Sequence, residues 1–179
     1  MDYAELESLV RQHGKAVYGF CLRLTASPAD AEDLYQETFL KAVELCRQLD
    51  EGRNPKAYLF SIAVGLHRNR RRKFAWRQRI APTSSLPEDS SCSEARPFSA
   101  ETASPEDIFL SRERAEGIRT AAEALGDRLR IPLYLHYTAE LSVDEIAATL
   151  GIPAGTVKSR LHKARKRIKL MLEAEDHER

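Results

Sequence analysis

The chain has 179 residues, of which 42% are hydrophobic and 31% are charged, so it can form one domain or two small ones with a core. Its formal net charge is only +1, but residues 65–80 and 156–169 each contain seven Lys or Arg and no Asp or Glu. Two concentrated basic segments on an acidic background indicate contacts with a polyanion at two places and different partners elsewhere.

The cysteines and the lack of long apolar runs exclude several classes of protein. Cys21, Cys46 and Cys92 are odd in number and have no CxxC spacing, so neither a disulfide framework nor a zinc site is supported. No apolar run is long enough to span a membrane, and the N-terminal sequence lacks a signal-peptide pattern. We therefore expect a cytoplasmic protein with no direct membrane insertion, no metal and no cofactor.

Two helices are predicted in the first fifty residues. Apolar residues recur on one broad face of residues 3–24, which is typical of an amphipathic helix. The sequence SPAD at residues 27–30 combines a capping Ser, a Pro suited to the first helical turn and an early acid. A second helix is therefore expected from residue 28 to about residue 49.

A third helix is predicted to start at Asn54-Pro55, which repeats the cap-then-proline pattern, and to run into the basic block GLHRNRRRKFAWRQR. Phe74 and Trp76 interleave the charges of this block. Arginines neutralise phosphates and an aromatic face stacks on a base, so the block fits a protein that holds unpaired DNA. Taken alone, Trp76 would fit a buried helix anchor better, and the arginines would also fit an ordinary solvated helix end.

Residues 81–104 interrupt the helical pattern. They are rich in Ser, Pro and Ala and show no apolar period, so they cannot bury enough apolar surface to offset the entropy of ordering. We expect a flexible acidic linker between two domains, residues 1–80 and 105–179.

The second domain is predicted to open with two helices. One starts at Pro105 and the other runs from Asp127 to about Tyr137, with Pro132 near its first turn or at a kink. The apolar period of these helices places Ile118 on the inner face, and Tyr137 is expected to point the same way.

Residues 142–169, SVDEIAATLGIPAGTVKSRLHKARKRIK, predict a helix, a tight turn and a basic second helix. Ser142 and Glu145 form a capping-box pattern. Gly151 sits where a helix ends in a left-handed residue, and Pro153 suits the first turn of the next helix. One apolar stripe follows, made of Val157, Leu161, Ala164, Ile168 and Leu172. Such a hairpin is what insertion into the major groove of DNA requires, whereas a merely solvated helix face normally mixes both signs of charge.

Three segments in this order resemble the bacterial RNA polymerase sigma factors of the extracytoplasmic-function (ECF) group. They are DAEDLYQETFLKAV (30–43), NPKAYLFSIAVGLHRNRRRK (54–73) and LSVDEIAATLGIPAGTVKSRLHKARKRI (141–168), so the resemblance covers nearly the whole chain. It implies an all-α fold of two small helical domains joined by a flexible linker, with the helix-turn-helix in the C-terminal one. It also implies a promoter-specificity subunit that binds core RNA polymerase and promoter DNA, assists melting, and is commonly held inactive by an anti-sigma factor.

The resemblance assigns the first domain to core polymerase and to the minus-ten promoter element. Core-polymerase binding is implied for Asp33, Gln36 and Glu37, which form one acidic patch on the second helix. An amide can meet a base edge with both a donor and an acceptor, while arginines hold phosphates. The residues expected at the minus-ten element are Arg68, Asn69, Arg71, Arg72, Lys73 and Trp76.

Two positions of the third helix depart from the family's pattern. Tyr58 stands where the family usually has Trp. Gly65 stands where the family often has an Asn that helps to hold a flipped-out base. The loop at residues 50–53 could carry part of the minus-ten specificity instead.

The resemblance assigns the second domain to the minus-thirty-five element, read as duplex DNA. Lys and Arg donate to guanine edges, and each good pair contributes about 1–3 kcal/mol of discrimination. The residues expected at this element are Thr156, Lys158, Ser159, Arg160, His162 and Lys163. Arg160, together with Arg165 and Arg167, is expected to contact phosphates.

Two other classes of function compete with a sigma factor. A stand-alone helix-turn-helix regulator would bind its operator tightly without polymerase, but no dimerisation helix is evident. A DNA-processing enzyme would need a nucleophile with a nearby base, or clustered carboxylates for a metal. Asp30, Asp33 and Glu37 lie on one helix with nothing elsewhere to complete such a site, so we expect no enzyme and no catalytic residues.

Overall fold

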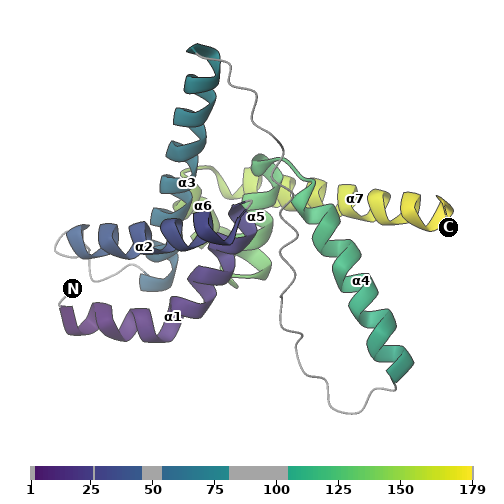
Figure 1. Cartoon of the computed structure of the whole chain (residues 1–179), viewed down its shortest axis with the longest axis horizontal. Coiled ribbons are helices and arrows are strands. Elements are labelled where there is room, and N and C mark those ends of the chain that lie inside the picture. Colours follow the sequence, from purple (N-terminus) through teal and green to yellow (C-terminus); the bar gives the residue numbers. More distant parts are fainter. Residues whose placement is uncertain (1–2, 26, 46–53, 81–104, 179) are drawn as a thin grey trace.

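The computed structural model describes residues 3–25, 27–45, 54–80 and 105–178, which form seven α-helices and no strand (Figure 1). The helices are α1 (Tyr3–Leu24), α2 (Pro28–Leu45), α3 (Pro55–Ile80), α4 (Pro105–Glu123), α5 (Asp127–Tyr137), α6 (Val143–Leu150) and α7 (Ala154–Glu178). The predicted all-helical class is confirmed for these residues. The predicted linker and the predicted end of the second helix lie outside them.

Helices α1, α2 and α3 pack against one another and form the N-terminal unit. In its core the rings of Phe20 and Phe60 meet edge to face, with centroids 5.1 Å apart. Both expected caps are present. The Ser27 hydroxyl accepts a hydrogen bond from the backbone N–H three residues on at 3.1 Å, and the Asn54 side chain accepts one from the N–H two residues on at 3.0 Å. These caps set the starts of α2 and α3.

Helix α3 has two halves in different surroundings. The first half has one buried face, whose residues include Leu59, Phe60 and Val64. His67 is the last buried residue of the helix. From residue 68 to residue 80 every side chain is exposed or half-buried, and Figure 1 shows this half projecting from the rest of the molecule. The basic block is therefore held in solvent on a continuous helix.

Helices α4 to α7 form the C-terminal unit, in which α4, α5 and α6 all contact α7. Ile131 of α5, Ile146 of α6 and Leu161 of α7 are at most 1% exposed in its core. Helix α5 starts at Asp127 as predicted, but Pro132 lies in its second turn and the helix continues through it. Proline has no N–H to donate, so one backbone hydrogen bond of α5 is lost here, while the residues from Ile131 to Leu135 are all buried.

The two units pack directly on each other, α3 against α6 and α1 against α5 (Figure 1). Polar contacts reinforce the first pairing: Asn54 donates to the Glu145 carboxylate, and the Lys56 ammonium lies 3.7 Å from the Glu140 carboxylate. The helix-turn-helix is thereby placed beside the helix that carries the other basic segment.

Candidate nucleic-acid interface

Helices α6 and α7 and the turn at residues 151–153 form the predicted helix-turn-helix. The capping box is present: the Ser142 hydroxyl accepts from the Glu145 N–H at 3.3 Å, and the Glu145 carboxylate accepts from the Ser142 N–H at 2.8 Å. Gly151 ends α6 with a φ of 64°, in the left-handed region that favours glycine. Pro153 stands one residue before α7, and its carbonyl accepts the first helical hydrogen bond, from Val157 at 3.2 Å.

The buried stripe of α7 decides which of its side chains face solvent. Val157, Leu161, Ala164 and Ile168 are buried as predicted, and Leu172 is half-buried. The polar face is therefore turned outward: among the residues expected at the minus-thirty-five element, the exposed ones are Lys158, Ser159, His162 and Lys163, and the half-buried ones are Thr156 and Arg160.

A basic groove with a volume of about 1120 Å³ runs beside α7. Four of the residues expected at the minus-thirty-five element line it, namely Thr156, Ser159, Arg160 and Lys163, together with Lys166 and Arg167. The start of α5 and Arg71 of α3 also line it. Lys158 and His162 lie outside the groove. Arg165 and Arg167 lie on different sides of α7. Arg165 lines a second, apolar groove, and its Nε donates to the Leu161 carbonyl at 3.3 Å.

The residues expected at the minus-ten element lie on the projecting half of α3. All six are exposed: Arg68, Asn69, Arg71, Arg72, Lys73 and Trp76. Within this set, Arg72 donates a 3.4 Å hydrogen bond to the Asn69 side-chain oxygen. Trp76 is 64% exposed, so it is not a buried helix anchor. Its ring is free to stack on a base.

The residues expected to bind core polymerase lie together on the outer face of α2. Asp33, Gln36 and Glu37 are exposed, while the opposite face of the helix is buried against α1 and α3. The Glu37 carboxylate is paired with the Arg70 guanidinium of α3 at 3.0 Å. This pair joins the acidic patch to the start of the basic block.

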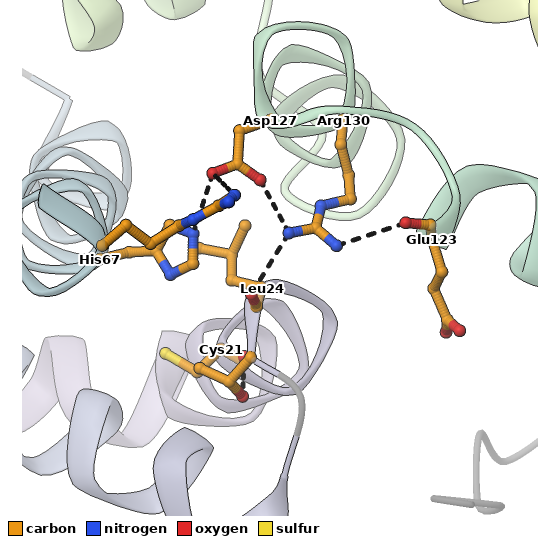
Figure 2. A network of polar contacts seen from close by, with 8 residues as sticks. Cys21, Leu24, His67, Glu123, Asp127 and Arg130 are labelled. Atoms are coloured by element: carbon orange, nitrogen blue, oxygen red, sulfur yellow. Dashed lines mark hydrogen bonds and ion pairs between the residues drawn. The ribbon is translucent and has the colours of Figure 1, made fainter. Parts of the chain in front are cut away.

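A polar network centred on Asp127 connects the two units, as Figure 2 shows. One carboxylate oxygen contacts the Arg71 guanidinium of α3 and lies 3.4 Å from Nε2 of His67. The other oxygen accepts from Arg130 at 2.8 Å, and the same Arg130 nitrogen lies 3.5 Å from the backbone carbonyl of Leu24 in α1. Asp127 and Arg130 thus contact both α3 and α1.

Burial and charge shift the pKa values of this network. Burial lowers the pKa of His67 below its ordinary value, and the charges of Arg130 and Arg71 act in the same direction against the opposing effect of Asp127. Burial alone would raise the pKa of Asp127, but the hydrogen bond from Arg71 and the charge of Arg130 outweigh it and hold the pKa below its usual range. At neutral pH the network therefore pairs a carboxylate with two guanidinium groups and a neutral imidazole.

Sequence reasoning missed this network. Arg71 and Asp127 are 56 residues apart and belong to different predicted domains, so no local period relates them. An acid in the first turn of a helix is normally explained by the helix dipole alone.

An apolar groove of about 560 Å³ lies between α4, α5 and α7. Ile118 and Tyr137, which were expected to face inward, are 48% and 58% exposed and line this groove, so that expectation is wrong. Both residues lie on the apolar faces of their helices, but these faces form the wall of a groove at this point and not a core. Four cationic residues also line the groove, Arg23, Arg119, Arg165 and Lys169, together with one acid, Glu173.

Comparison with known proteins identifies the family. Residues 9–78 match the family model for Sigma-70 region 2, and residues 115–168 match the one for Sigma-70, region 4. The ECF RNA polymerase sigma factor SigW of Bacillus subtilis is 32% identical over 175 residues, which span 96% of this chain and 90% of SigW. The chain belongs to the ECF RNA polymerase sigma factors. The resemblance stated from the sequence motifs is confirmed.

The match covers different shares of two further relatives of this sigma factor. The ECF sigma factor SigL of Mycobacterium tuberculosis (strain H37Rv) is 31% identical, over 96% of this chain and 91% of SigL. The ECF sigma factor SigE of Mycolicibacterium smegmatis is 33% identical over 91% of this chain, and the match spans only 60% of SigE.

Solved structures share the fold of this sigma factor. The sigma factor RpoE, in its co-crystal structure with the anti-sigma factor NepR from Bartonella quintana, superimposes with a TM-score of 0.77 at 24% identity, over 94% of this chain and 97% of that one. CnrH, in its complex with the cytosolic domain of CnrY, gives a TM-score of 0.66 at 20% identity, over 97% and 90% of the two chains.

Groups that could perform chemistry are sparse in the part of the sigma factor that the structure describes. No three His, Cys, Asp or Glu side chains of these residues are arranged to hold a metal ion. Burial raises the pKa of the Cys21 thiol to about 12, so it is not a nucleophile at neutral pH. None of the described helices combines the length and apolar character needed to cross a membrane.

Proposed function

We propose that this sigma factor directs core RNA polymerase to promoters by reading two DNA elements with two separate surfaces, and that it assists melting without being an enzyme. The observation that carries the proposal is the pairing of a helix-turn-helix with a second basic helix whose last half projects into solvent. A regulator that only bound duplex DNA would not need that second surface. The proposal locates the protein in the cytoplasm, where core polymerase acts.

Helix α7 is the reader of the minus-thirty-five element. A recognition helix enters the major groove with a face of donors, and its buried stripe fixes that face relative to the rest of the unit. Ser159 and Lys163 lie one helical turn apart on the exposed face, so both can reach base edges, and Lys158 and His162 flank them. Arg167 is placed to contact a phosphate beside them.

The projecting half of α3 holds the unpaired minus-ten element. Its arginines neutralise phosphates and set position, while Asn69 can pair with a base edge and Trp76 can stack on a base. Apart from the neighbouring residues and backbone of α3 itself, no atom lies within 4 Å of the position that a Cβ on Gly65 would take, so this part of the helix is open to an incoming nucleotide.

The remaining surfaces serve protein partners. The acidic patch on α2 fits a basic surface of core polymerase. The apolar groove between α4, α5 and α7 is lined by four cations and one acid, so it fits an amphipathic acidic helix such as an anti-sigma factor could supply. RpoE and CnrH, which share the fold, have been solved in complexes, RpoE with an anti-sigma factor. The proposed division of the chain remains residues 1–80, a linker at 81–104, and 105–179.

Run-off transcription with purified core polymerase tests the division of labour. The templates are one promoter as full duplex and the same promoter with the minus-ten region already unpaired. Lys163→Ala should reduce transcription from both templates, because each lost base pair contact costs about 1–3 kcal/mol. Asn69→Ala should reduce transcription mainly from the duplex template.

Two results would count against the proposal. The first is that wild-type protein gives no promoter-dependent transcript with core polymerase on any genomic template. The second is that both variants behave alike on the two templates. Tight operator binding without polymerase, unchanged in a double variant with Asp33→Ala and Gln36→Ala, would point to a stand-alone regulator instead.

A further inference from the structure

We propose that the basic groove beside α7 holds the phosphate backbone of duplex DNA, and that Arg128 of α5 is one of its phosphate contacts. The proposal rests on the proposed function, because it extends the surface that reads the minus-thirty-five element. It adds a second helix to that surface and assigns the groove to sequence-independent binding, distinct from base reading by the exposed face of α7.

The groove is strongly positive, and most of its charge is not compensated. Six cationic residues and one acid, Asp127, line it. Asp127 is engaged by Arg71 and Arg130, so it does not neutralise the other cations of the groove. Among the described residues, no side chain forms a hydrogen bond or an ion pair with the remaining five, which are Arg128, Arg160, Lys163, Lys166 and Arg167.

The apolar groove on the other side of α7 shows the usual arrangement of surface cations. There the Lys169 ammonium lies 3.5 Å from the Glu173 carboxylate, and the Arg119 guanidinium lies 3.1 Å from Glu116. Five like charges that share one groove without such partners repel one another, and they raise the local concentration of anions. The basic groove therefore fits a polyanion supplied from outside the chain.

The far end of the groove lies where phosphates pass when α7 enters the major groove of DNA. Recognition helices contact base edges with their N-terminal residues. The major groove is about 12 Å wide, which about eight residues of a helix span at about 1.5 Å per residue. Lys166 and Arg167 follow the start of α7 at Ala154 by more than that, so they lie beyond the base edges, at the level of the backbone.

Arg128 brings a contact from a different helix to the same place. It is exposed in the first turn of α5, and α5 packs against α7 in the core of the same unit. Its position relative to Lys166 and Arg167 is therefore fixed by that core. A guanidinium offers a fork of donors that matches phosphate oxygens. Phosphates held from two helices would set the angle at which α7 enters the DNA, because backbone contacts fix orientation.

The first test measures binding of the full-length protein to two fluorescein-labelled DNA duplexes of unrelated sequence, by anisotropy over a series of salt concentrations. Arg128→Gln should lower the affinity about tenfold at about 0.05 M salt, and the slope of log affinity against log salt should fall by about 0.9, the value for one phosphate. The loss should be the same for both duplexes, because phosphates carry no sequence information.

The matched control is Arg114→Gln, which removes the same charge from an exposed position of α4 that lines neither groove. It should bind both duplexes with the wild-type slope. An unchanged slope in Arg128→Gln would overturn the proposal. A loss confined to one duplex would also overturn it, because that result indicates base reading.

The conservative variant Arg128→Lys separates a phosphate contact from a structural role. It keeps the charge, so it should recover most of the affinity and the wild-type salt slope, with thermal unfolding confirming that all the variants are folded. A lysine variant that loses as much slope as Arg128→Gln would reject the phosphate contact.

The same measurements distinguish this inference from the proposed function. If wild-type protein binds neither duplex and directs no transcription with core polymerase, the proposed function fails. If wild-type protein binds both duplexes with a steep salt dependence and Arg128→Gln follows the same line, only the assignment of Arg128 and the groove fails.

Discussion

Two glycines inside helices of the N-terminal unit differ in the space that a Cβ would have. In α1, a Cβ on Gly14 would lie 3.0 Å from the Tyr35 hydroxyl, and the Tyr35 ring is held between Tyr18 and Phe39 at centroid distances of 5.6 and 4.8 Å. In α3, a Cβ on Gly65 would meet no atom within 4 Å. Gly14 therefore permits close packing of α1 on α2, whereas packing does not require Gly65.

Alanine at these two positions should have different effects on stability. Gly65→Ala should raise the free energy of unfolding by about 0.5–1 kcal/mol, because alanine loses less backbone entropy in a helix. Gly14→Ala should give no such gain, since Tyr35 must shift. Chemical denaturation followed by circular dichroism measures both.

A double variant checks the cause. Removing the hydroxyl with Tyr35→Phe should restore the gain from Gly14→Ala, so that the two changes are not additive. If Gly14→Ala already stabilises the protein as much as Gly65→Ala does, the close approach to Tyr35 has no energetic consequence.

Among the helices, α6 is the shortest, with eight residues, and it depends most on its ends. The Ser142–Glu145 capping box satisfies first-turn backbone donors that have no partner within the helix, and Gly151 provides the left-handed exit. In a helix of two turns these end contacts are a large share of the backbone hydrogen bonds. The orientation of the recognition helix therefore depends on residues that do not face DNA.

Serine-to-alanine changes at the cap of α6 and on the exposed face of α7 should separate stability from DNA reading. Ser142→Ala should lower the free energy of unfolding by about 1 kcal/mol, through loss of the cap. Ser159→Ala should leave it within about 0.5 kcal/mol of wild type, because Ser159 is exposed on α7. Thermal unfolding and minus-thirty-five duplex binding, measured on both variants, test this. Equal loss of stability would show that the cap has no special role.

Helix α3 carries an aromatic side chain that stability does not require. Because Trp76 is 64% exposed, Trp76→Ala should change the free energy of unfolding by less than about 0.5 kcal/mol. It should weaken binding to single-stranded DNA by about 1–3 kcal/mol, the contribution of one stacked base. Trp76→Phe keeps a ring and should retain part of the affinity. Undiminished binding by the alanine variant would exclude stacking at this position.

At the scale of the whole molecule, the packing of the units should respond to pH through His67. This side chain faces Asp127 and Arg130 of α5 and Arg71 of its own helix, and its pKa in the packed state lies below the ordinary value, chiefly because it is buried. Separation of the units exposes the imidazole and returns its pKa toward about 6.5. The separated state then binds a proton more readily, so packing is most stable above about pH 6.5 and weakens as pH falls below it.

Scattering at two pH values tests this response. The radius of gyration should increase between about pH 7.5 and about pH 5.5 in wild-type protein, and the change should be smaller in His67→Gln. The depressed pKa of Asp127 keeps its carboxylate charged across this range, so its contribution is lost only at lower pH. The same pH response in His67→Gln would assign it to another group.

The sequence by itself determined the elements and the family. Caps at Ser27, Asn54 and Ser142 are local patterns that set helix starts whatever packs around them, and the starts of α2, α3 and α6 agree with the structure. The stripe on α7 is also local, because a period of three to four residues fixes which side is buried. The exposure of Lys158 and Lys163 could therefore be predicted.

Only the tertiary structure decided where apolar and charged side chains of different helices meet. The period of α4 placed Ile118 on an apolar face, but whether that face meets a core or lines a groove depends on the neighbouring helices. Arg71 and Asp127 are 56 residues apart, and each alone has an ordinary local explanation. Periodicity describes one helix at a time, whereas the ion pair and the groove depend on how the units pack, because contact energies act between residues close in space rather than in sequence.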